Sequence, residues 1–288
     1  MTVQTSGRPA RLRGPALLWL DLTRVCQLEC VHCLNSSGPQ GRHGSMSREQ
    51  WQQVLTDAAA GGTSMVQMFG GEPSLHPDFP ILVEYALALG LEVEVYTNLV
   101  HVTDRLWTLY RAPGLRLATS YYGARPDDHN AVTRRPSHAR TRANIVKALA
   151  SGVPLRAGVI DTGIPGAAES AREELERLGV RDVRIDRVRA AGRGAGAPHA
   201  GGLCGRCGQG RAAVGPDGDV TPCPFASGLV AGNVRAGDSL AAILSSGVLA
   251  QSAAAVQGGG DDDDDDDDDD PDEECSPGFP GSSCTPRN

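Results

Sequence analysis

Short apolar runs alternate with longer amphipathic runs from residue 17 to residue 187, and this alternation constrains the fold more than any other feature. Short apolar runs are typical of buried strands, whereas longer runs with one apolar face are typical of helices. The predicted strands are Leu17–Leu22, Met65–Phe69, Leu91–Thr97, Leu115–Tyr121, Leu155–Ile160 and Val183–Arg187, and the predicted helices are Ser47–Ala60, Asp78–Leu89, Thr103–Arg111, Arg140–Ser151 and Ala167–Leu178. Six strands alternating with five helices indicate parallel βα units in an α/β protein, as an open sheet or a partial barrel.

Candidate ligand-binding residues follow four of the predicted strands. A loop with three cysteines follows the first strand, Gly70-Gly71-Glu72 follows the second, Asn98 follows the third, and Ser120 lies at the end of the fourth. Ligand sites in parallel α/β folds form at the carboxyl ends of the strands. We therefore expect these residues to share one rim of the sheet.

The cysteines of the first loop are Cys26, Cys30 and Cys33. Thiolates are the usual ligands of iron–sulfur clusters, and three of them leave one iron of a four-iron cube open to a small molecule. Zinc is the competing metal, but it usually takes a paired Cys-x2-Cys and a fourth ligand. His32 lies between two of the cysteines, where its side chain is poorly placed to bind the same metal. The spacing favours a cluster and leaves zinc as the alternative.

Two motifs resemble those of the radical S-adenosylmethionine (SAM) superfamily. The spacing Cys26-x3-Cys30-x2-Cys33 after a first strand matches the family signature, and Gly70-Gly71-Glu72-Pro73 after the second strand matches its GGE(P) motif. The resemblance covers roughly residues 15–190. It implies a partial (βα)6 TIM-like barrel with a [4Fe–4S] cluster, whose open iron binds the amino and carboxylate groups of SAM. One departure is His32, at a position where the family often has an aromatic residue.

The resemblance also implies which residues bind SAM. The two glycines let the backbone approach the methionyl amino group, and Glu72 can accept a charge-assisted hydrogen bond from that ammonium. Pro73 completes the motif, and Asn98 and Ser120 are placed near the ribose and carboxylate of SAM by analogy with the family. In a purely structural interpretation, the glycines form a turn, Glu72 begins a helix, and Ser120 packs inside the barrel.

A second cysteine-bearing segment follows a Gly/Ala-rich linker. It contains a predicted hairpin over residues 211–221 and a helix over Ser239–Ser246. Its cysteines are Cys204, Cys207, Cys223, Cys275 and Cys284. A zinc-ribbon-like site is a competitor, but Cys207-x10-Gly218-x4-Cys223 resembles the SPASM or twitch extension of radical SAM enzymes, which binds auxiliary [4Fe–4S] clusters. A full SPASM module has seven cysteines, whereas the five here fully ligate one cluster. We expect one auxiliary cluster held by Cys204 or Cys207, Cys223 and the late pair, with the exact four open.

Four segments are expected along the chain: a polar leader (1–14), the core barrel (15–190), a linker (191–203) and the SPASM/twitch-like module (204–288). The formal net charge is −8, but 13 of the 35 acidic residues lie between 261 and 274. The ten consecutive Asp residues, 261–270, are expected to be solvated and disordered because like charges repel. The rest of the chain is mildly basic.

Composition and apolar patterning bear on partners and location. The chain has no dense Lys/Arg stripe interleaved with aromatic residues, so nucleic acid is not an expected partner. The longest apolar stretches are too short to span a bilayer, and no signal peptide is visible. We therefore expect a cytoplasmic protein without membrane contact.

The resemblance implies an enzyme that reductively cleaves SAM to methionine and a 5′-deoxyadenosyl radical, which removes hydrogen from a substrate. Many SPASM-bearing relatives modify ribosomally made peptides, so a precursor peptide that acquires a cross-link or related change is the leading substrate. An epimerase, dehydrogenase or dehydratase acting on a small metabolite, such as a sugar or nucleoside, is the alternative. The implied electron donor is a flavodoxin or ferredoxin. A non-catalytic zinc- or iron–sulfur-binding protein is the third alternative, and it leaves Gly70–Pro73 unexplained.

Overall fold

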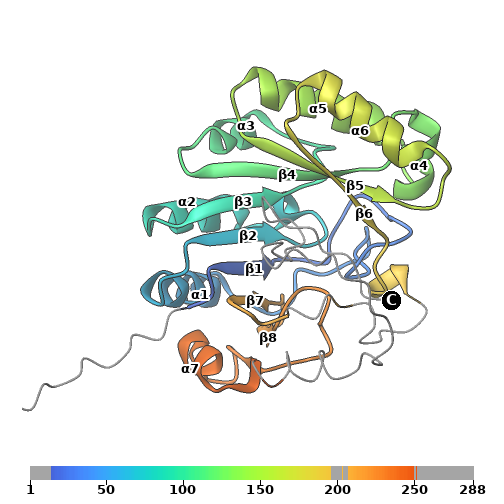
Figure 1. The fold of residues 1–288 in the computed structure, drawn as a ribbon. Coiled ribbons are helices and arrows are strands. Elements are labelled where there is room, and N and C mark those ends of the chain that lie inside the picture. Colours follow the sequence, from blue (N-terminus) through green and yellow to red (C-terminus); the bar gives the residue numbers. More distant parts are fainter. Residues whose placement is uncertain (1–13, 196–202, 204–206, 250, 252–288) are drawn as a thin grey trace, which may run out of the picture.

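One mixed sheet passes through the protein and joins both cysteine-bearing segments (Figure 1). The computed structural model describes residues 14–195, 203, 207–249 and 251. The strands are β1 (Leu17–Asp21), β2 (Met65–Phe69), β3 (Glu92–Tyr96), β4 (Leu115–Tyr121), β5 (Leu155–Asp161), β6 (Asp182–Arg187), β7 (Arg211–Val214), β8 (Asp219–Thr221) and β9 (Gly232–Asn233). The α-helices are α1 (Arg48–Ala60), α2 (Phe79–Ala88), α3 (Asp104–Tyr110), α4 (Pro126–Thr133), α5 (His138–Ala150), α6 (Ala167–Leu178) and α7 (Leu240–Ser245), and two short 3₁₀ turns are η1 (Pro73–Leu75) and η2 (Gly192–Gly194).

The strand order is β6-β5-β4-β3-β2-β1-β7-β8-β9. Strands β1 to β6 are parallel to their neighbours, which confirms the predicted βα units and the fold class of a partial (βα)6 barrel. The carboxyl ends of these strands lie at one edge of the sheet, which is where the predicted site residues were expected to meet.

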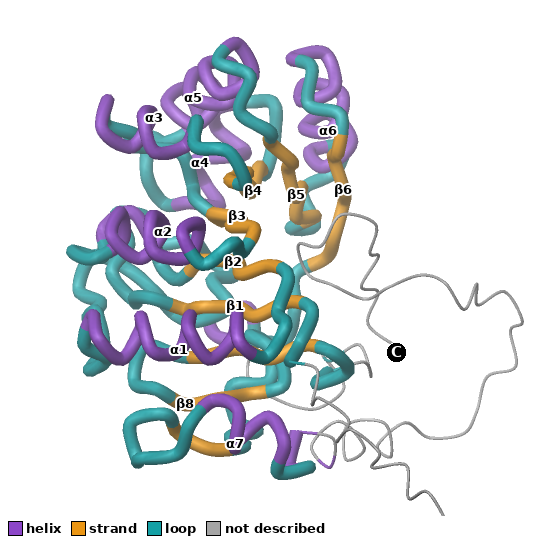
Figure 2. Tube along the Cα trace, turned by 90° about the vertical axis from the view of Figure 1, so that its left-hand side faces the viewer, coloured by secondary structure: helices purple, strands orange, loops and turns teal. Residues whose placement is uncertain are grey.

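The sheet has two different faces. On one face, strand residues such as Leu18, Val66 and Val93 pack with the apolar sides of the helices in the larger core cluster. Figure 2 shows α1, α2 and α3 on this side of the strands. On the other face, Leu17, Trp19 and other strand residues form a smaller cluster that also contains cysteines of the second module. The first face is therefore covered by helices, and the second is covered by the C-terminal module beside β1 and β2.

Local sequence signals set several helix boundaries. The Ser47 side chain accepts from the backbone N–H of Gln50, and the Gln50 side chain accepts from the Ser47 N–H, so the predicted capping box is present. The C-terminus of α6 is capped by Gly179, whose φ of 99° is a left-handed conformation that glycine adopts without strain.

Two features of the fold were absent from the sequence-based prediction. The first is α4, which begins with Pro126 and buries His129 and Val132. The second is the way the C-terminal module joins the barrel. Strand β7 pairs parallel with β1, and β8 and β9 continue the sheet in antiparallel order. The predicted hairpin and the helix near Ser239–Ser246 are both confirmed.

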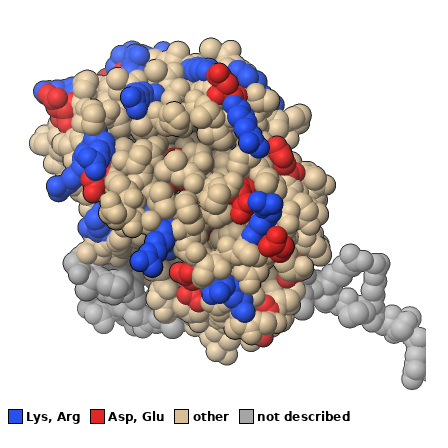
Figure 3. Space-filling model, turned by 180° about the vertical axis from the view of Figure 1, so that it is seen from behind, with Lys and Arg blue, Asp and Glu red and all other residues tan. Residues whose placement is uncertain are grey.

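Several predictions fall on residues outside the described part of the chain: the polar leader up to residue 13, the Asp run, and Cys204, Cys275 and Cys284. Over the described residues, none of the helices combines the length and apolar character that a bilayer-spanning helix requires. On the face shown in Figure 3, basic and acidic side chains are interspersed and do not gather into one basic patch.

Candidate metal and cofactor site

A cavity of about 830 Å³ lies at the carboxyl ends of the parallel strands. This volume falls in the range of small-molecule and cofactor sites, which is roughly 300–1,000 Å³. Predicted site residues from four different strand ends line it, namely Cys26, Cys30, Cys33, Gly70, Gly71, Asn98 and Ser120. Pro224 and Phe225 of the second module also line the cavity. The structure therefore brings together residues that are far apart in the sequence, as the rim argument predicted.

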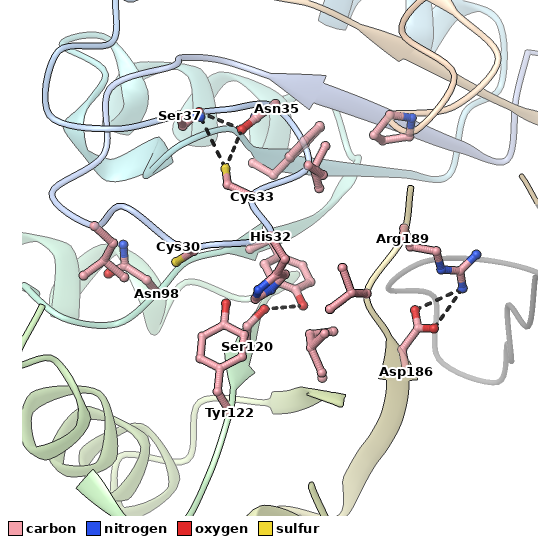
Figure 4. A pocket seen from close by; sticks show the side chains of 18 of the residues that line it. Cys30, His32, Cys33, Asn35, Ser37, Asn98, Ser120, Tyr122, Asp186 and Arg189 are labelled. Carbon is pink, nitrogen blue, oxygen red and sulfur yellow. Dashed lines mark hydrogen bonds and ion pairs between the residues drawn. The ribbon is translucent and has the colours of Figure 1, made fainter. Parts of the chain in front are cut away.

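The cysteine loop holds its sulfur atoms with hydrogen bonds from the chain itself (Figure 4). The backbone N–H groups of Leu28 and Ser37 donate to the sulfurs of Cys26 and Cys33, at 3.4 and 3.3 Å. The Cys33 thiol also lies 3.1 Å from the Asn35 side-chain oxygen. Hydrogen bonds to cluster sulfurs are one means by which a protein sets a reduction potential.

Burial disfavours the charged form of these thiols. Burial, with smaller contributions from the charges of neighbouring cysteines, raises the pKa of Cys26 to about 12 and that of Cys30 to about 11. Without a nearby cation such thiols stay protonated at neutral pH, whereas iron or zinc converts a coordinating thiol to the thiolate. In the described part of the chain, no three His, Cys, Asp or Glu side chains meet around one point suited to a single metal ion.

The Gly70-Gly71 pair lies directly against the backbone that leads into the cysteine loop. The N–H of Gly71 donates to the Thr23 carbonyl at 2.6 Å, and the N–H of Glu72 donates to the Val25 carbonyl at 2.9 Å. A Cβ on Gly70 would lie 2.6 Å from the Thr23 oxygen, and one on Gly71 would lie 2.4 Å from the Val25 oxygen. Since no side chain fits there, both glycines are needed for the two loops to approach each other.

Glu72 is buried, with 1% of its surface exposed. Its carboxylate accepts hydrogen bonds from the backbone N–H and hydroxyl of Ser74, from the Thr97 hydroxyl and from the backbone N–H of Asn98, at 2.7–3.2 Å. Burial raises the pKa of Glu72, and these hydrogen bonds oppose that rise. The carboxylate thus ties the end of β2 to the end of β3. Its predicted contact with the SAM ammonium stays a prediction, as does a role for the buried Pro73, which begins η1.

Asn98 and Ser120 each have partners in the cavity wall. The Asn98 side-chain oxygen accepts from the Gln27 amide at 3.0 Å, and its nitrogen lies 3.7 Å from the Cys26 sulfur. The Ser120 hydroxyl lies 3.0 Å from the Tyr96 hydroxyl. Asn98 therefore braces the cysteine loop, and the binding roles predicted for both residues stay predictions.

Sequence reasoning missed Arg193, which lies in the segment predicted to be a linker. Its side chain donates to the carbonyls of Cys30 and Ser37 at 2.8 and 2.7 Å, and its backbone N–H donates to the Cys33 carbonyl at 2.9 Å. A Cβ on the preceding Gly192 would lie 2.3 Å from that Cys33 oxygen. The Gly/Ala-rich composition hid this role, because it is typical of a spacer.

His32 and Tyr122 were also missed as a pair. Their rings meet edge to face, with centroids 5.1 Å apart, and both line the cavity (Figure 4). Burial, with a contribution from the Arg193 charge, lowers the pKa of His32 to about 4. His32 therefore lies in the wall as a neutral ring at neutral pH.

Two cysteines of the C-terminal module lie close to residues that line the cavity. Cys207 and Cys223 are buried, with their sulfur atoms 3.3 Å apart. They belong to the inner apolar cluster that contains Trp19 and Phe69, two residues that also line the cavity. The C-terminal module therefore packs beside the cavity, and the identity of its metal ligands stays a prediction.

The comparisons with known proteins agree with this arrangement. Residues 20–179, more than half of the chain, match the model of the radical SAM superfamily, and residues 204–277 match that of the SPASM iron–sulfur cluster-binding domain. The chain belongs to the radical SAM superfamily. The predicted resemblance is confirmed, and membership implies a [4Fe–4S] cluster and SAM as cofactors. Three thiols on one loop, with backbone N–H groups donating to the sulfur atoms of two of them, fit the ligand set of such a cluster.

The chain is similar to several curated enzymes over part of its length. The chain is 32% identical to mycofactocin maturase MftC of Mycobacterium tuberculosis over 187 residues, which is 64% of this chain and 47% of the maturase. It is 30% identical to PqqA peptide cyclase of Streptomyces rochei over 51% of this chain and 41% of the cyclase. The chain thus spans about half the length of the curated relatives it matches. The fold is similar to that of Streptococcus suis SuiB bound to precursor peptide SuiA, with a TM-score of 0.69 and 13% identity over 85% of this chain and 66% of SuiB.

Proposed function

We propose that this protein is a radical SAM enzyme that modifies a ribosomally made peptide. The observation that carries this proposal is the single cavity that collects Cys26, Cys30, Cys33 and the Gly70-Gly71 backbone. When bound, the cluster and SAM supply the electron and the 5′-deoxyadenosyl radical that removes hydrogen from the substrate. The names of the relatives support the substrate class, because they include a mycofactocin maturase, a PqqA peptide cyclase and a structure of SuiB bound to a precursor peptide.

The residues of this chain have three tasks in that chemistry. The three cysteines hold the cluster, and Arg193 and Asn98 keep their loop in place. The Gly70-Gly71 backbone and Ser120 form the wall against which SAM lies. The apolar residues Trp19, Phe69 and Phe225 exclude water from the cavity, which protects a reactive radical from side reactions.

The proposal also includes an auxiliary cluster in the C-terminal module. Cys207 and Cys223 lie beside the cavity, which supports an auxiliary [4Fe–4S] cluster that shapes the site or accepts an electron from the substrate radical. A flavodoxin or ferredoxin is the proposed electron donor. We also infer a cytoplasmic location, because an iron–sulfur cluster and the Cys26, Cys30 and Cys33 thiols that would hold it are best preserved in a reducing compartment.

The test is co-expression with the short open reading frame nearest the gene, followed by mass spectrometry of the peptide. We expect the peptide to lose hydrogen atoms and to give fragments that show a cross-link or related change. The Cys26→Ala variant, which lacks one cluster ligand, should leave the peptide unmodified. An unchanged peptide, together with turnover of a sugar or nucleoside by the purified enzyme, would replace the peptide class with a small metabolite.

A further inference from the structure

Leu99, which follows Asn98 in the loop after β3, has an unusual backbone conformation. Its φ is 55°, in the left-handed region that residues with a Cβ rarely adopt, and its side chain is fully buried. Such a conformation persists only where the surrounding contacts impose it, and it is concentrated at functional sites. The contacts that impose it therefore indicate what the loop after β3 is held for.

Helix α5 holds this loop by two consecutive carbonyl groups. The Thr141 hydroxyl donates to the Asn98 carbonyl at 2.9 Å, and the Asn144 amide donates to the Leu99 carbonyl at 2.7 Å. The Leu99 N–H donates to the Thr97 hydroxyl at 3.2 Å. Thr141 is buried and also lines the cavity. Both backbone groups of Leu99 thus bond to side chains, and two residues of α5 fix the course of the loop.

Hydrogen bonds inside the loop determine which way the Asn98 side chain faces. Its Oδ1 atom accepts from the backbone N–H of Val100 at 2.9 Å and from the Gln27 amide at 3.0 Å. A backbone N–H can only donate, so this oxygen cannot exchange places with the amide nitrogen. The Nδ2 atom then faces the Cys26 sulfur, 3.7 Å away. The loop therefore directs an N–H donor at one of the three proposed cluster ligands.

A donor at this position affects the electron transfer that the proposed function requires. Reduction adds negative charge to a cluster, so an N–H that donates to a ligand sulfur stabilises the reduced form more than the oxidised form. The Leu28 backbone N–H gives the Cys26 sulfur one such donor, and the Asn98 amide gives it a second. The Leu28 donor belongs to the cysteine loop itself, whereas the Asn98 donor depends on the loop after β3 and hence on α5.

We propose that Thr141 and Asn144 are positioning residues that set the reduction potential of the SAM-binding cluster, because they hold the Asn98 amide against Cys26. This inference rests on the proposed function, since it takes Cys26 as a cluster ligand. It goes beyond that function by giving helix α5 a task in electron transfer. Helix α5 fixes the backbone of Asn98 and Leu99, this backbone fixes the Asn98 amide, and the amide donates to the sulfur.

The test measures reduction of this cluster in the reconstituted full-length chain, by electron paramagnetic resonance at a series of fixed solution potentials. The SAM-binding cluster is recognised because its signal changes when SAM is added, which separates it from an auxiliary cluster. Asn98→Leu removes the donor and should lower the ratio of reduced to oxidised cluster at a fixed potential by about two- to fivefold. Thr141→Val and Asn144→Ala should lower the same ratio by about twofold or more. Thr141→Ser, which keeps the hydroxyl, should retain the wild-type ratio.

The matched control is Thr56→Val on α1. The Thr56 hydroxyl donates to the Gln52 carbonyl at 2.9 Å, and Thr56 is not among the described residues that line the cavity. Its loss should therefore leave the ratio unchanged. If the buried Asn98 carbonyl prevents Thr141→Val from folding, Asn144→Ala provides the test, because Asn144 is partly exposed and water can replace its amide.

Four outcomes would overturn the proposal. These are an unchanged ratio in Asn98→Leu, wild-type ratios in both α5 variants, a Thr141→Ser variant that behaves like Thr141→Val, and a shift in Thr56→Val as large as that in Thr141→Val. A wild-type chain that forms no SAM-responsive cluster would contradict the proposed function and this inference with it. A wild-type cluster that cleaves SAM, together with unchanged ratios in the variants, would contradict this inference alone.

Discussion

The substitution Glu72→Gln separates two roles for the acidic residue of the glycine motif. Gln has the size of Glu but replaces one carboxylate oxygen with an NH2 group. In either orientation this NH2 group faces a backbone N–H, that of Ser74 at one oxygen or that of Asn98 at the other. One lost charge-assisted bond and one unsatisfied buried donor together cost about 2–4 kcal/mol of unfolding free energy.

The matched variant is Ser74→Ala, which removes one hydroxyl donor to Glu72 and leaves the carboxylate in place. It should cost about 1 kcal/mol. Both variants are measured by urea unfolding of the chain and by equilibrium binding of SAM to the reconstituted protein. If Glu72 serves to hold the ends of β2 and β3 together, stability and SAM affinity fall together in both variants, with the larger loss in Glu72→Gln. The reasoning is refuted if Glu72→Gln keeps wild-type stability but loses SAM affinity, while Ser74→Ala changes neither.

Three further predictions concern other parts of the molecule. Cys223→Ser should lower the iron content of the reconstituted protein while leaving reductive cleavage of SAM in place, whereas unchanged iron would exclude Cys223 as a ligand. Gly192→Ala places a Cβ 2.3 Å from the Cys33 carbonyl and should lower cluster incorporation, whereas Gly163→Ala, at a similar positive φ with open space around it, should not. Burial lowers the pKa of His129 to about 3, so below pH 6.5 the unfolded chain binds a proton that the folded chain excludes. Unfolding free energy should fall by about 2 kcal/mol from pH 7 to pH 5 through this group. His129→Phe keeps the ring contacts and should reduce that fall; an identical pH dependence would show that His129 is not responsible.

The sequence predicted the parts of the fold that depend on local patterns. The six parallel strands, five of the barrel helices and the Ser47 cap follow from apolar periodicity and capping chemistry, which act over a few residues. Helix α4 was missed because its short sequence, which begins at Pro126, mixes polar and apolar residues without a clear apolar face. The pairing of β7 with β1 was missed because strand partners far apart in the chain leave no local signal.

The residues of the candidate site were also predicted only where a local sequence pattern marks them. The cysteine spacing and the Gly70-Gly71 motif are short-range patterns, and the alternation of strands and helices was enough to place them on one rim. The hydrogen bonds from Arg193 to the cysteine loop and the Glu94–Arg156 ion pair depend on contacts between segments that are distant in sequence. Arg193 lies in a segment whose composition is typical of a spacer, and Arg156 lies in an ordinary strand. Only the three-dimensional arrangement shows what they hold.

The central claim is that Cys26, Cys30 and Cys33 hold a cluster that cleaves SAM. The most direct measurement is the release of 5′-deoxyadenosine after anaerobic reconstitution with iron and sulfide and addition of SAM and a strong reductant. The wild-type chain should release 5′-deoxyadenosine and methionine together, and Cys26→Ala should release neither. A reconstituted protein with intact cluster absorbance and no 5′-deoxyadenosine, or a purified protein that holds zinc and no iron, would contradict the account.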